Sequence, residues 1–318
     1  MTISLDSLKY EWEADWAKLP AMEGWSHHGL VINRDGNIVT GHATEPKILV
    51  LDKDGELLKE FKVPVTETHG ICIVEEDGVE LLWIADTGDK HNSESYGPPR
   101  VVKVDMEGNE LAQITKENLG YGKEEWFCPT SVAVDSRNGD IWIADGYGES
   151  RVHRLSKDFE HMFGRSGTKK VGGFSCPHWI FIDPRKEETQ VYVADRANHR
   201  VQVLNRNGRL VSSITEGLKT PSVFSSFGDY LVIGELYARL VVLDKEDNIV
   251  GYIGDGTEYT DIEGWPNRKD GKKLLSPLSD ISVGKFNSPH GMAADCEGNI
   301  YISEWLLGDR FTKLKRIA

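Results

Sequence analysis

Alternation of apolar and polar residues recurs along the whole chain in stretches of a few residues. The most regular segments begin with Lys or Arg, alternate, pass through an Asp-Gly or Asn-Gly turn and alternate again, as in residues 47–61 (KILVLDKDGELLKEF) and 200–214 (RVQVLNRNGRLVSSI). A period of two places side chains on opposite faces of a strand, and these turns are the ones that β-hairpins favour. The pattern predicts antiparallel hairpins throughout.

A unit of roughly 40 residues repeats six times. In each unit a short apolar strand begins near Pro or His, a second strand ends in an acidic residue, and a hairpin supplies the third and fourth strands. The second strands end in LWIADTG, IWIADGY, VYVADRA, LVIGELY, IYISEWL and, less clearly, NIVTGHA. Such units predict an all-β, six-bladed β-propeller, which leaves only protected strand edges. A solenoid is the alternative, but it needs capping ends that the sequence does not show.

We predict a single propeller domain over residues 1–318. Its blades span about residues 25–63, 66–117, 127–165, 175–215, 219–254 and 286–318. The sixth unit lacks a fourth strand, and the alternating residues 8–16 (LKYEWEADW) have no blade of their own. We therefore expect this N-terminal strand to complete the last blade and close the ring. Residues 255–285 are expected to form an insertion loop on the face that carries the candidate site.

That face is defined by the strand directions. The start of the first strand and the end of the second lie at the same end of a blade, because neighbouring strands of a meander are antiparallel. The six first-strand starts are His28, His69, Thr130, His178, Ser222 and His290. Three of the histidines come from alternate blades, about 120° apart in a regular ring. We predict that His69, His178 and His290 converge on one point.

Three neutral imidazole nitrogens with one open position are typical of a catalytic zinc site. We predict that the three histidines bind Zn²⁺ or another divalent transition metal, because an imidazole-only set disfavours Ca²⁺ and Mg²⁺. The alternative for each is a hydrogen-bonded turn residue. His28 lies outside the threefold pattern, and is either a group that supports the metal or faces the substrate, or a structural turn residue.

Two polar side chains follow directly on acidic strand ends, Tyr147 after Asp145 and Arg196 after Asp195. A phenol near a metal can act as a general base, because the cation lowers its pKa. A guanidinium can bind a carboxylate through two hydrogen bonds. We predict that Tyr147 and Arg196 are catalytic and substrate-binding groups. Without a nearby metal each would be a surface loop residue, Arg196 in a salt bridge.

The acids that end the second strands recur in nearly every repeat, which predicts a structural role. We expect them to accept backbone N–H groups or to pair with arginines between blades. The acids are Asp86, Asp145, Asp195, Glu235 and Glu304, and the candidate partners are Arg151, Arg200, Arg239 and Arg310.

Composition narrows the classes of function. The net charge of −14 counts against a nucleic-acid partner, which requires a basic face. No run approaches the roughly 18 apolar residues of a membrane-spanning helix, and the N-terminus lacks the basic and apolar segments of a signal peptide. Four scattered cysteines without a CxxC pair favour a reducing compartment. We expect a cytoplasmic protein with no nucleic-acid or membrane partner; the sequence is silent on oligomeric state.

The order of the motifs resembles a known family. ADRANHRVQVL (194–204) resembles an NHL repeat, and the set as a whole resembles the peptidyl-α-hydroxyglycine α-amidating lyases. The matching motifs are THG at His69, FCPTSVAVD from Phe127, DGYGESR from Asp145, CPHWIFI from Cys176 and SPHGM from Ser288. They run in the family's order from about residue 66 onward. Each is weak alone, but their ordered combination is specific.

The resemblance implies a six-bladed propeller in which His69, His178 and His290 bind zinc. It implies that Tyr147 is the catalytic tyrosine and Arg196 one of the substrate-binding arginines. The family cleaves a C-terminal α-hydroxyglycine to leave a peptide amide and glyoxylate, with the substrate hydroxyl on the zinc.

Two departures from the family pattern bear on the substrate and on a structural calcium. The family's first-blade arginine falls at Ala43, and the acid that follows its last metal-binding histidine is Gly291 here. The loss of the arginine indicates a changed substrate-binding shell. The loss of the acid counts against the family's structural calcium.

We therefore expect a zinc-dependent lyase or hydrolase that acts on a small hydroxylated polar or anionic molecule, or on a peptide terminus, with a substrate different from the family's. A non-catalytic NHL-type platform for protein or peptide binding is the first alternative. A calcium-dependent, lactonase-like hydrolase is the second, and it fits a histidine ring less well.

Overall fold

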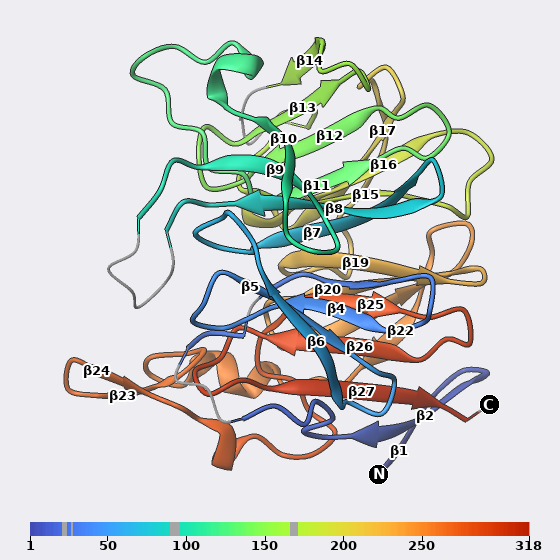
Figure 1. Cartoon of the computed structure of the whole chain (residues 1–318). Helices are drawn as coiled ribbons and strands as arrows, with labels where there is room; N and C mark the ends of the chain where they lie inside the picture. Colours follow the sequence, from blue (N-terminus) through green and yellow to red (C-terminus); the bar gives the residue numbers. More distant parts are fainter. Residues whose placement is uncertain (21–23, 27, 90–95, 166–170, 318) are drawn as a thin grey trace. The chain divides into compact units, whose positions relative to one another are not determined.

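The computed structural model (Figure 1) describes residues 1–20, 24–26, 28–89, 96–165 and 171–317. In these ranges the chain forms six antiparallel sheets of at least four strands and a two-stranded ribbon. In five of the six blade sheets the strands that follow one another in the sequence are neighbours, so these sheets are meanders, and in the sixth β27 also pairs with an N-terminal strand. The sheets are the blades of a β-propeller, which confirms the predicted fold class. Blades are numbered here in chain order, from the sheet that begins at residue 30.

The chain divides into two compact units, each described by itself. Unit 1 comprises Met1–Glu45, Leu49–Glu60 and Ser222–Ala318, and unit 2 comprises Pro46–Ile48 and Phe61–Pro221. None of the short helices in the described ranges has the length and apolar character needed to cross a membrane.

Unit 2 contains blades two, three and four. Blade two is β7 (Gly70–Glu76), β8 (Val79–Asp86), β9 (Arg100–Asp105) and β10 (Glu110–Ile114). Blade three is β11 (Ser131–Val134), β12 (Ile141–Asp145), β13 (Arg151–Leu155) and β14 (His161–Arg165). Blade four is β15 (Pro177–Ile182), β16 (Gln190–Asp195), β17 (Arg200–Asn205) and β18 (Leu210–Ile214). The first strands β7, β11 and β15 pack side by side.

Aromatic residues of the second strands fill the space between the blades of unit 2. Trp83 of β8 is buried in a cluster with Val132 and Ile143 of blade three. Trp142 of β12 is buried in the next cluster, with Ile180 of blade four. Each such ring removes about 150–250 Å² of surface from water, so these positions hold neighbouring blades together.

Unit 1 contains blades one, five and six. Blade one is β3 (Leu30–Ile32), β4 (Ile38–Gly41), β5 (Lys47–Leu51) and β6 (Leu57–Lys62), of which Lys47, Ile48 and the last two residues of β6 belong to unit 2. Blade five is β19 (Pro221–Phe227), β20 (Tyr230–Glu235), β21 (Arg239–Leu243) and β22 (Ile249–Ile253). Blade six contains β25 (Pro289–Ala294), β26 (Ile300–Glu304) and β27 (Phe311–Arg316).

Blade six is completed by the N-terminal strand, as predicted. β2 (Leu8–Glu13) pairs with β27, with Trp12 opposite Leu314, and β1 (Thr2–Leu5) adds a fifth strand that the sequence analysis did not predict. The expected strand 8–16 is shorter than predicted, because Asp15 adopts a left-handed backbone conformation (φ 50°). β1 pairs only with β2 and is half exposed, so its burial pattern is too weak to detect in the sequence.

The insertion at residues 255–285 contains two short 3-10 helices, η3 (Thr257–Asp261) and η4 (Leu278–Asp280), and the ribbon β23 (Arg268–Asp270)–β24 (Lys273–Leu275). Its Trp265 donates from Nε1 to the carbonyl oxygen of Asn287, 3.2 Å away. Asn267 accepts the backbone N–H of Leu307 at 3.0 Å. In unit 1 the insertion is therefore attached at the end of blade six from which β25 starts.

Candidate active site

His69 is held where two blades of unit 2 meet. Its Nδ1–H donates to the carbonyl oxygen of Thr130 at 2.6 Å, since a carbonyl oxygen can only accept. Nε2 therefore carries the lone pair, and it lies 3.3 Å from the hydroxyl of Tyr147. This buried imidazole is in the tautomer that can bind a metal through Nε2.

The glycine of the THG motif makes this contact sterically feasible. A β-carbon on Gly70 would lie 2.5 Å from the carbonyl oxygen of Thr130 and 2.8 Å from the Cα of Ser131. Both are backbone atoms, which cannot move aside as the end of a side chain can. Glycine at this position therefore allows blades two and three to approach closely enough for His69 to reach Thr130.

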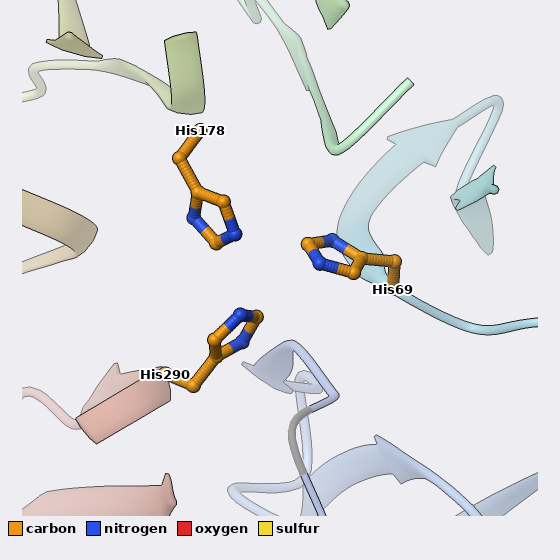
Figure 2. Close-up of side chains that lie close together, drawn as sticks. All are labelled: His69, His178 and His290. Atoms are coloured by element: carbon orange, nitrogen blue, oxygen red, sulfur yellow. The ribbon is translucent and has the colours of Figure 1, made fainter. Parts of the chain in front are cut away.

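Tyr147 lies between two histidines of unit 2. Its hydroxyl is 3.1 Å from Nε2 of His178 and 3.3 Å from Nε2 of His69. The two imidazole rings are 5.1 Å apart, centre to centre, and Figure 2 shows them turned toward each other. His178 is buried on β15, at an irregularity in the pairing of β15 with β16. The structure thus brings three of the predicted site residues into contact.

Arg196 joins this group from the 3-10 helix η2 (Arg196–Asn198), directly after β16. Its guanidinium lies 5.6 Å from the centre of the Tyr147 ring, and Nη2 donates to the sulfur of Cys176 at 3.2 Å. The side chain is held from two sides and remains partly exposed. It presents a fixed positive charge beside the phenol.

The protein surroundings raise the pKa of Tyr147. Burial of the hydroxyl end is the main cause, and the positive charge of Arg196 opposes it. The residue as a whole is 37% exposed. Arg196 alone does not make this phenol a base at neutral pH, so the predicted role of Tyr147 depends on a further positive charge at the two Nε2 atoms.

The recurrent acids of unit 2 hold the loops that precede the site residues. Asp86 accepts the backbone N–H groups of Thr66 and Glu67, just before His69. Asp195 accepts the backbone N–H of Ser175, just before His178. These hydrogen bonds bear out the predicted structural role of the acids.

Three of the four candidate arginines pair with the acids, but each pair lies within one blade and not between blades as predicted, because the acid ends the second strand and the arginine lies at or just before the start of the third strand of the same sheet. Arg200, Arg239 and Arg310 pair with Asp195, Glu235 and Glu304 at 2.7, 2.6 and 2.5 Å. In blade three Arg151 pairs with Glu125 instead, because the hydroxyl of Tyr121 occupies Oδ2 of Asp145 at 2.6 Å. No sequence pattern indicates this exchange, since Tyr121 lies in a loop outside the repeats.

In unit 1, His290 lies on β25 and is buried, at a pairing irregularity like that of His178. The backbone of the buried His28 lies next to Gly291, the residue that follows His290. The carbonyl oxygen of His28 accepts a hydrogen bond from the hydroxyl of Ser303 at 2.9 Å. A β-carbon on Gly291 would lie 1.9 Å from that carbonyl oxygen. An acidic side chain, which the family resemblance implies at this position, would therefore have no space. Crowding by the His28 carbonyl explains why this chain has glycine at residue 291.

Two contributors to the site had no assigned role in the sequence analysis. The carbonyl oxygen of Thr130 orients His69, and the thiol of Cys176 binds Arg196. A backbone carbonyl carries no sequence signal. The motif CPH does contain Cys176, but its contact with a residue 20 positions later depends on the fold.

The fold and this group of side chains define a β-propeller built of NHL-type repeats. The family model for the NHL repeat matches residues 128–157. NHL repeat-containing protein 3 of Mus musculus is 30% identical over 81% of this chain and 70% of its own length. The chain therefore belongs to the family of NHL repeat-containing protein 3.

Lyases are also among the homologues. Peptidyl-alpha-hydroxyglycine alpha-amidating lyase 1 of Drosophila melanogaster is 28% identical over 74% of this chain and 42% of its own length. Among solved structures, a streptogramin B lyase has a TM-score of 0.60 at 17% identity, covering 97% of this chain and 98% of that one. A gluconolactonase of Xanthomonas campestris has a TM-score of 0.62 at 15% identity, covering 98% and 91%. These two likenesses show the fold.

Proposed function

We propose that the protein is a metal-dependent lyase or hydrolase that acts on a small hydroxylated, polar or anionic substrate or on a peptide terminus. The observation that carries this proposal is the position of the Tyr147 hydroxyl, within 3.3 Å of the Nε2 atoms of both His69 and His178. The amidating lyases among the homologues support an enzymatic role.

The proposed metal ligands are His69 and His178 of unit 2 and His290 of unit 1. All three are buried and each offers one ring nitrogen, and within unit 2 the Nε2 atoms of His69 and His178 both lie within 3.3 Å of the Tyr147 hydroxyl. The participation of His290, which belongs to the other unit, is part of the proposal. Imidazole nitrogens suit Zn²⁺ or a similar divalent transition metal, whereas Ca²⁺ prefers oxygen ligands.

A metal held here would supply a positive charge that acidifies a hydroxyl or a water. The same charge would lower the pKa of Tyr147, against the effect of burial. Tyr147 would then take a proton from the substrate, and Arg196 would hold an anionic group of the substrate beside it. His28 is proposed to relay protons.

A carbon–nitrogen lyase reaction like that of the amidating lyases is the form we favour, with a substrate that differs from theirs because Ala43 replaces the family's arginine. Hydrolysis uses the same groups, with water in place of the substrate hydroxyl. We propose no nucleic-acid or membrane partner. The four free cysteines support a cytoplasmic location.

A non-catalytic binding platform is the second candidate. It is favoured by membership of the family of NHL repeat-containing protein 3, whose name states no reaction. It predicts that the three histidines bind no metal and that Tyr147 is replaceable.

Metal analysis separates the two candidates. We would purify the protein without added metal, measure bound zinc by mass spectrometry and titrate zinc into the chelator-treated protein. His69→Ala and His178→Ala should lose binding, and exposed His199→Ala should retain it. Equal zinc binding by all four proteins would contradict the proposed centre. Loaded protein would then be screened against peptidyl-α-hydroxyglycines, hydroxy acids and sugar lactones.

A further inference from the structure

A continuous chain of hydrogen bonds runs through blade three from an exposed histidine to the loop that carries Tyr147. Nε2 of His161, on β14, lies 3.1 Å from Nδ1 of His153 on β13. Nε2 of His153 lies 2.8 Å from the hydroxyl of Tyr121. That hydroxyl donates to Oδ2 of Asp145 at 2.6 Å. All four residues belong to unit 2.

The donor and the acceptor can be assigned in each of these hydrogen bonds, starting from Asp145. Tyr121 gives its hydroxyl proton to the carboxylate, so Nε2–H of His153 donates to the phenol oxygen. Nδ1 of His153 then accepts from Nε2–H of His161. Burial, the neighbouring His161 and Arg151 hold the pKa of His153 at about 3, so the buried imidazole stays neutral.

Charged residues of both signs lie near Tyr121. Arg151 lies 4.5 Å from the centre of the Tyr121 ring and pairs with Glu125. Asp145 and Glu149 both raise the pKa of Tyr121, after the larger effect of burial, and Arg151 opposes them. Tyr121 therefore stays protonated and continues to donate its hydrogen bond to Asp145.

At its inner end the chain fixes the backbone on both sides of Tyr147. Asp145 accepts the backbone N–H groups of Cys128 at 2.7 Å and Glu149 at 2.8 Å. The N–H of Tyr147 itself donates to the carbonyl oxygen of Cys128 at 3.2 Å. The position of the Tyr147 hydroxyl thus depends on the orientation of one buried carboxylate.

In blade three the acidic strand end, Asp145, accepts a hydrogen bond from a neutral tyrosine, whereas the acids of blades four, five and six pair with an arginine. The histidine pair is also tightly enclosed: a β-carbon on Gly164, opposite His153 across β13 and β14, would lie 3.2 Å from Nδ1 of His153 and 3.3 Å from the ring of His161. The blade that presents Tyr147 therefore carries its own, differently built support.

We propose that Tyr121 and His153 are positioning residues for Tyr147. Through Asp145 they set the distance of the Tyr147 hydroxyl from His69 and His178. His161 is the exposed end of the hydrogen-bonded chain. The inference rests on the proposed role of Tyr147 as the proton-transferring group.

The first test measures backbone hydrogen exchange by mass spectrometry in the full-length protein. Tyr121→Phe removes the hydroxyl and keeps the ring that packs on Phe127 and Arg151. Exchange at the amides of Cys128 and Glu149 should accelerate about tenfold or more, because Asp145 loses the hydrogen bond from the Tyr121 hydroxyl, 2.6 Å long, that orients it. Tyr301→Phe is the matched control: it removes a Tyr–Asp hydrogen bond in blade six and should leave both amides unchanged.

The second test uses His153 and a kinetic measurement. His153→Leu should accelerate the same amides, and His153→Gln, which can donate from its amide nitrogen, should restore them. On the compound that the zinc-loaded protein turns over among the screened peptidyl-α-hydroxyglycines, hydroxy acids and sugar lactones, His153→Leu should lower kcat with KM unchanged, and His153→Gln should recover it. A purely structural role predicts changes across all blades and no rescue.

Unchanged exchange at Cys128 and Glu149 in both Tyr121→Phe and His153→Leu would overturn the positioning role. A fully active Tyr147→Phe would instead overturn the proposed function, and the exchange measurements would still decide whether the chain holds the loop.

Discussion

The Nδ1–H of His69 and the carbonyl oxygen of Thr130 are 2.6 Å apart, and this bond joins the starts of β7 and β11. It fixes the tautomer of His69 and directs the lone pair of Nε2 toward Tyr147 and His178. The chemistry of the candidate site thus depends on how closely two blades pack, which leads to the first prediction.

Gly70→Ala should disturb the site through packing alone. The added methyl group would press on the Thr130 carbonyl oxygen and the Ser131 Cα, so we expect a loss of about 1–3 kcal/mol in the free energy of unfolding. Zinc affinity should fall as His69 moves. Urea unfolding and a zinc titration measure both effects. Gly122→Ala, where the nearest atoms to the added carbon belong to the Glu125 side chain at 3.4 Å or more, should match the wild type.

Tyr147→Phe should abolish proton transfer and preserve the fold. The phenyl ring keeps its place beside Arg196, so substrate binding should change little. General-base catalysis contributes about 10²–10⁴-fold, and kcat should fall by that factor. Steady-state kinetics on a cleaved substrate provide the measurement, and a variant with wild-type kcat would exclude Tyr147 as the base.

Arg196→Ala should weaken substrate binding rather than the chemical step. A hydrogen bond to a charged group contributes about 1.5–3 kcal/mol, so KM should rise about 10–100-fold for an anionic substrate. Arg196→Lys should recover only part of this loss, because a lysine lacks the planar pair of donors. If KM rises equally for a neutral analogue, the carboxylate-binding role is wrong.

Asp195→Asn should destabilise unit 2 and loosen the loop before His178. The carboxylate is fully buried and binds Arg200 at 2.7 Å and the N–H of Ser175 at 2.7 Å. Removal of its charge leaves a buried guanidinium without its counter-ion, which costs about 3 kcal/mol or more. Urea unfolding would show this loss, whereas the exposed Asp54→Asn should change stability by less than about 0.5 kcal/mol.

His153 should make the protein less stable as the pH falls. Its pKa is lowered from 6.5 to about 3 in the folded chain, so between these values the unfolded chain binds more protons. Stability contributed by the neutral imidazole is present above pH 6.5 and is lost as the pH falls toward 3, by at most about 1.4 kcal/mol per pH unit.

His153→Gln removes this effect and should lose less stability than the wild type between pH 6.5 and 4.5. Urea midpoints at three pH values in this range would measure it. Parallel curves for the two proteins would show that His153 does not titrate as its burial requires. His199→Gln, on an exposed turn, should follow the wild-type curve.

The fold could be predicted because its information is local. Each blade repeats the same alternation, turns and acidic strand end, and a strand needs only a few residues to show its period. The N-terminal strand β2 was predictable for the same reason, since residues 8–16 alternate between apolar and polar and belong to none of the six repeats. β1 and the ribbon β23–β24 were missed, because short exposed strands bury too little apolar surface to leave a pattern.

The candidate residues could be predicted from their place in the repeat, but their interactions could not. By itself the sequence determined the propeller class and placed His69, His178 and His290 at equivalent strand starts, with Tyr147 and Arg196 after acidic strand ends. Only the tertiary structure decided that Thr130 sets the tautomer of His69, that Tyr121 displaces Arg151 from Asp145, and that His28 leaves no space beside Gly291. These contacts join residues 24 to 263 positions apart, and their distances follow from the packing of strands against one another, which no local pattern encodes.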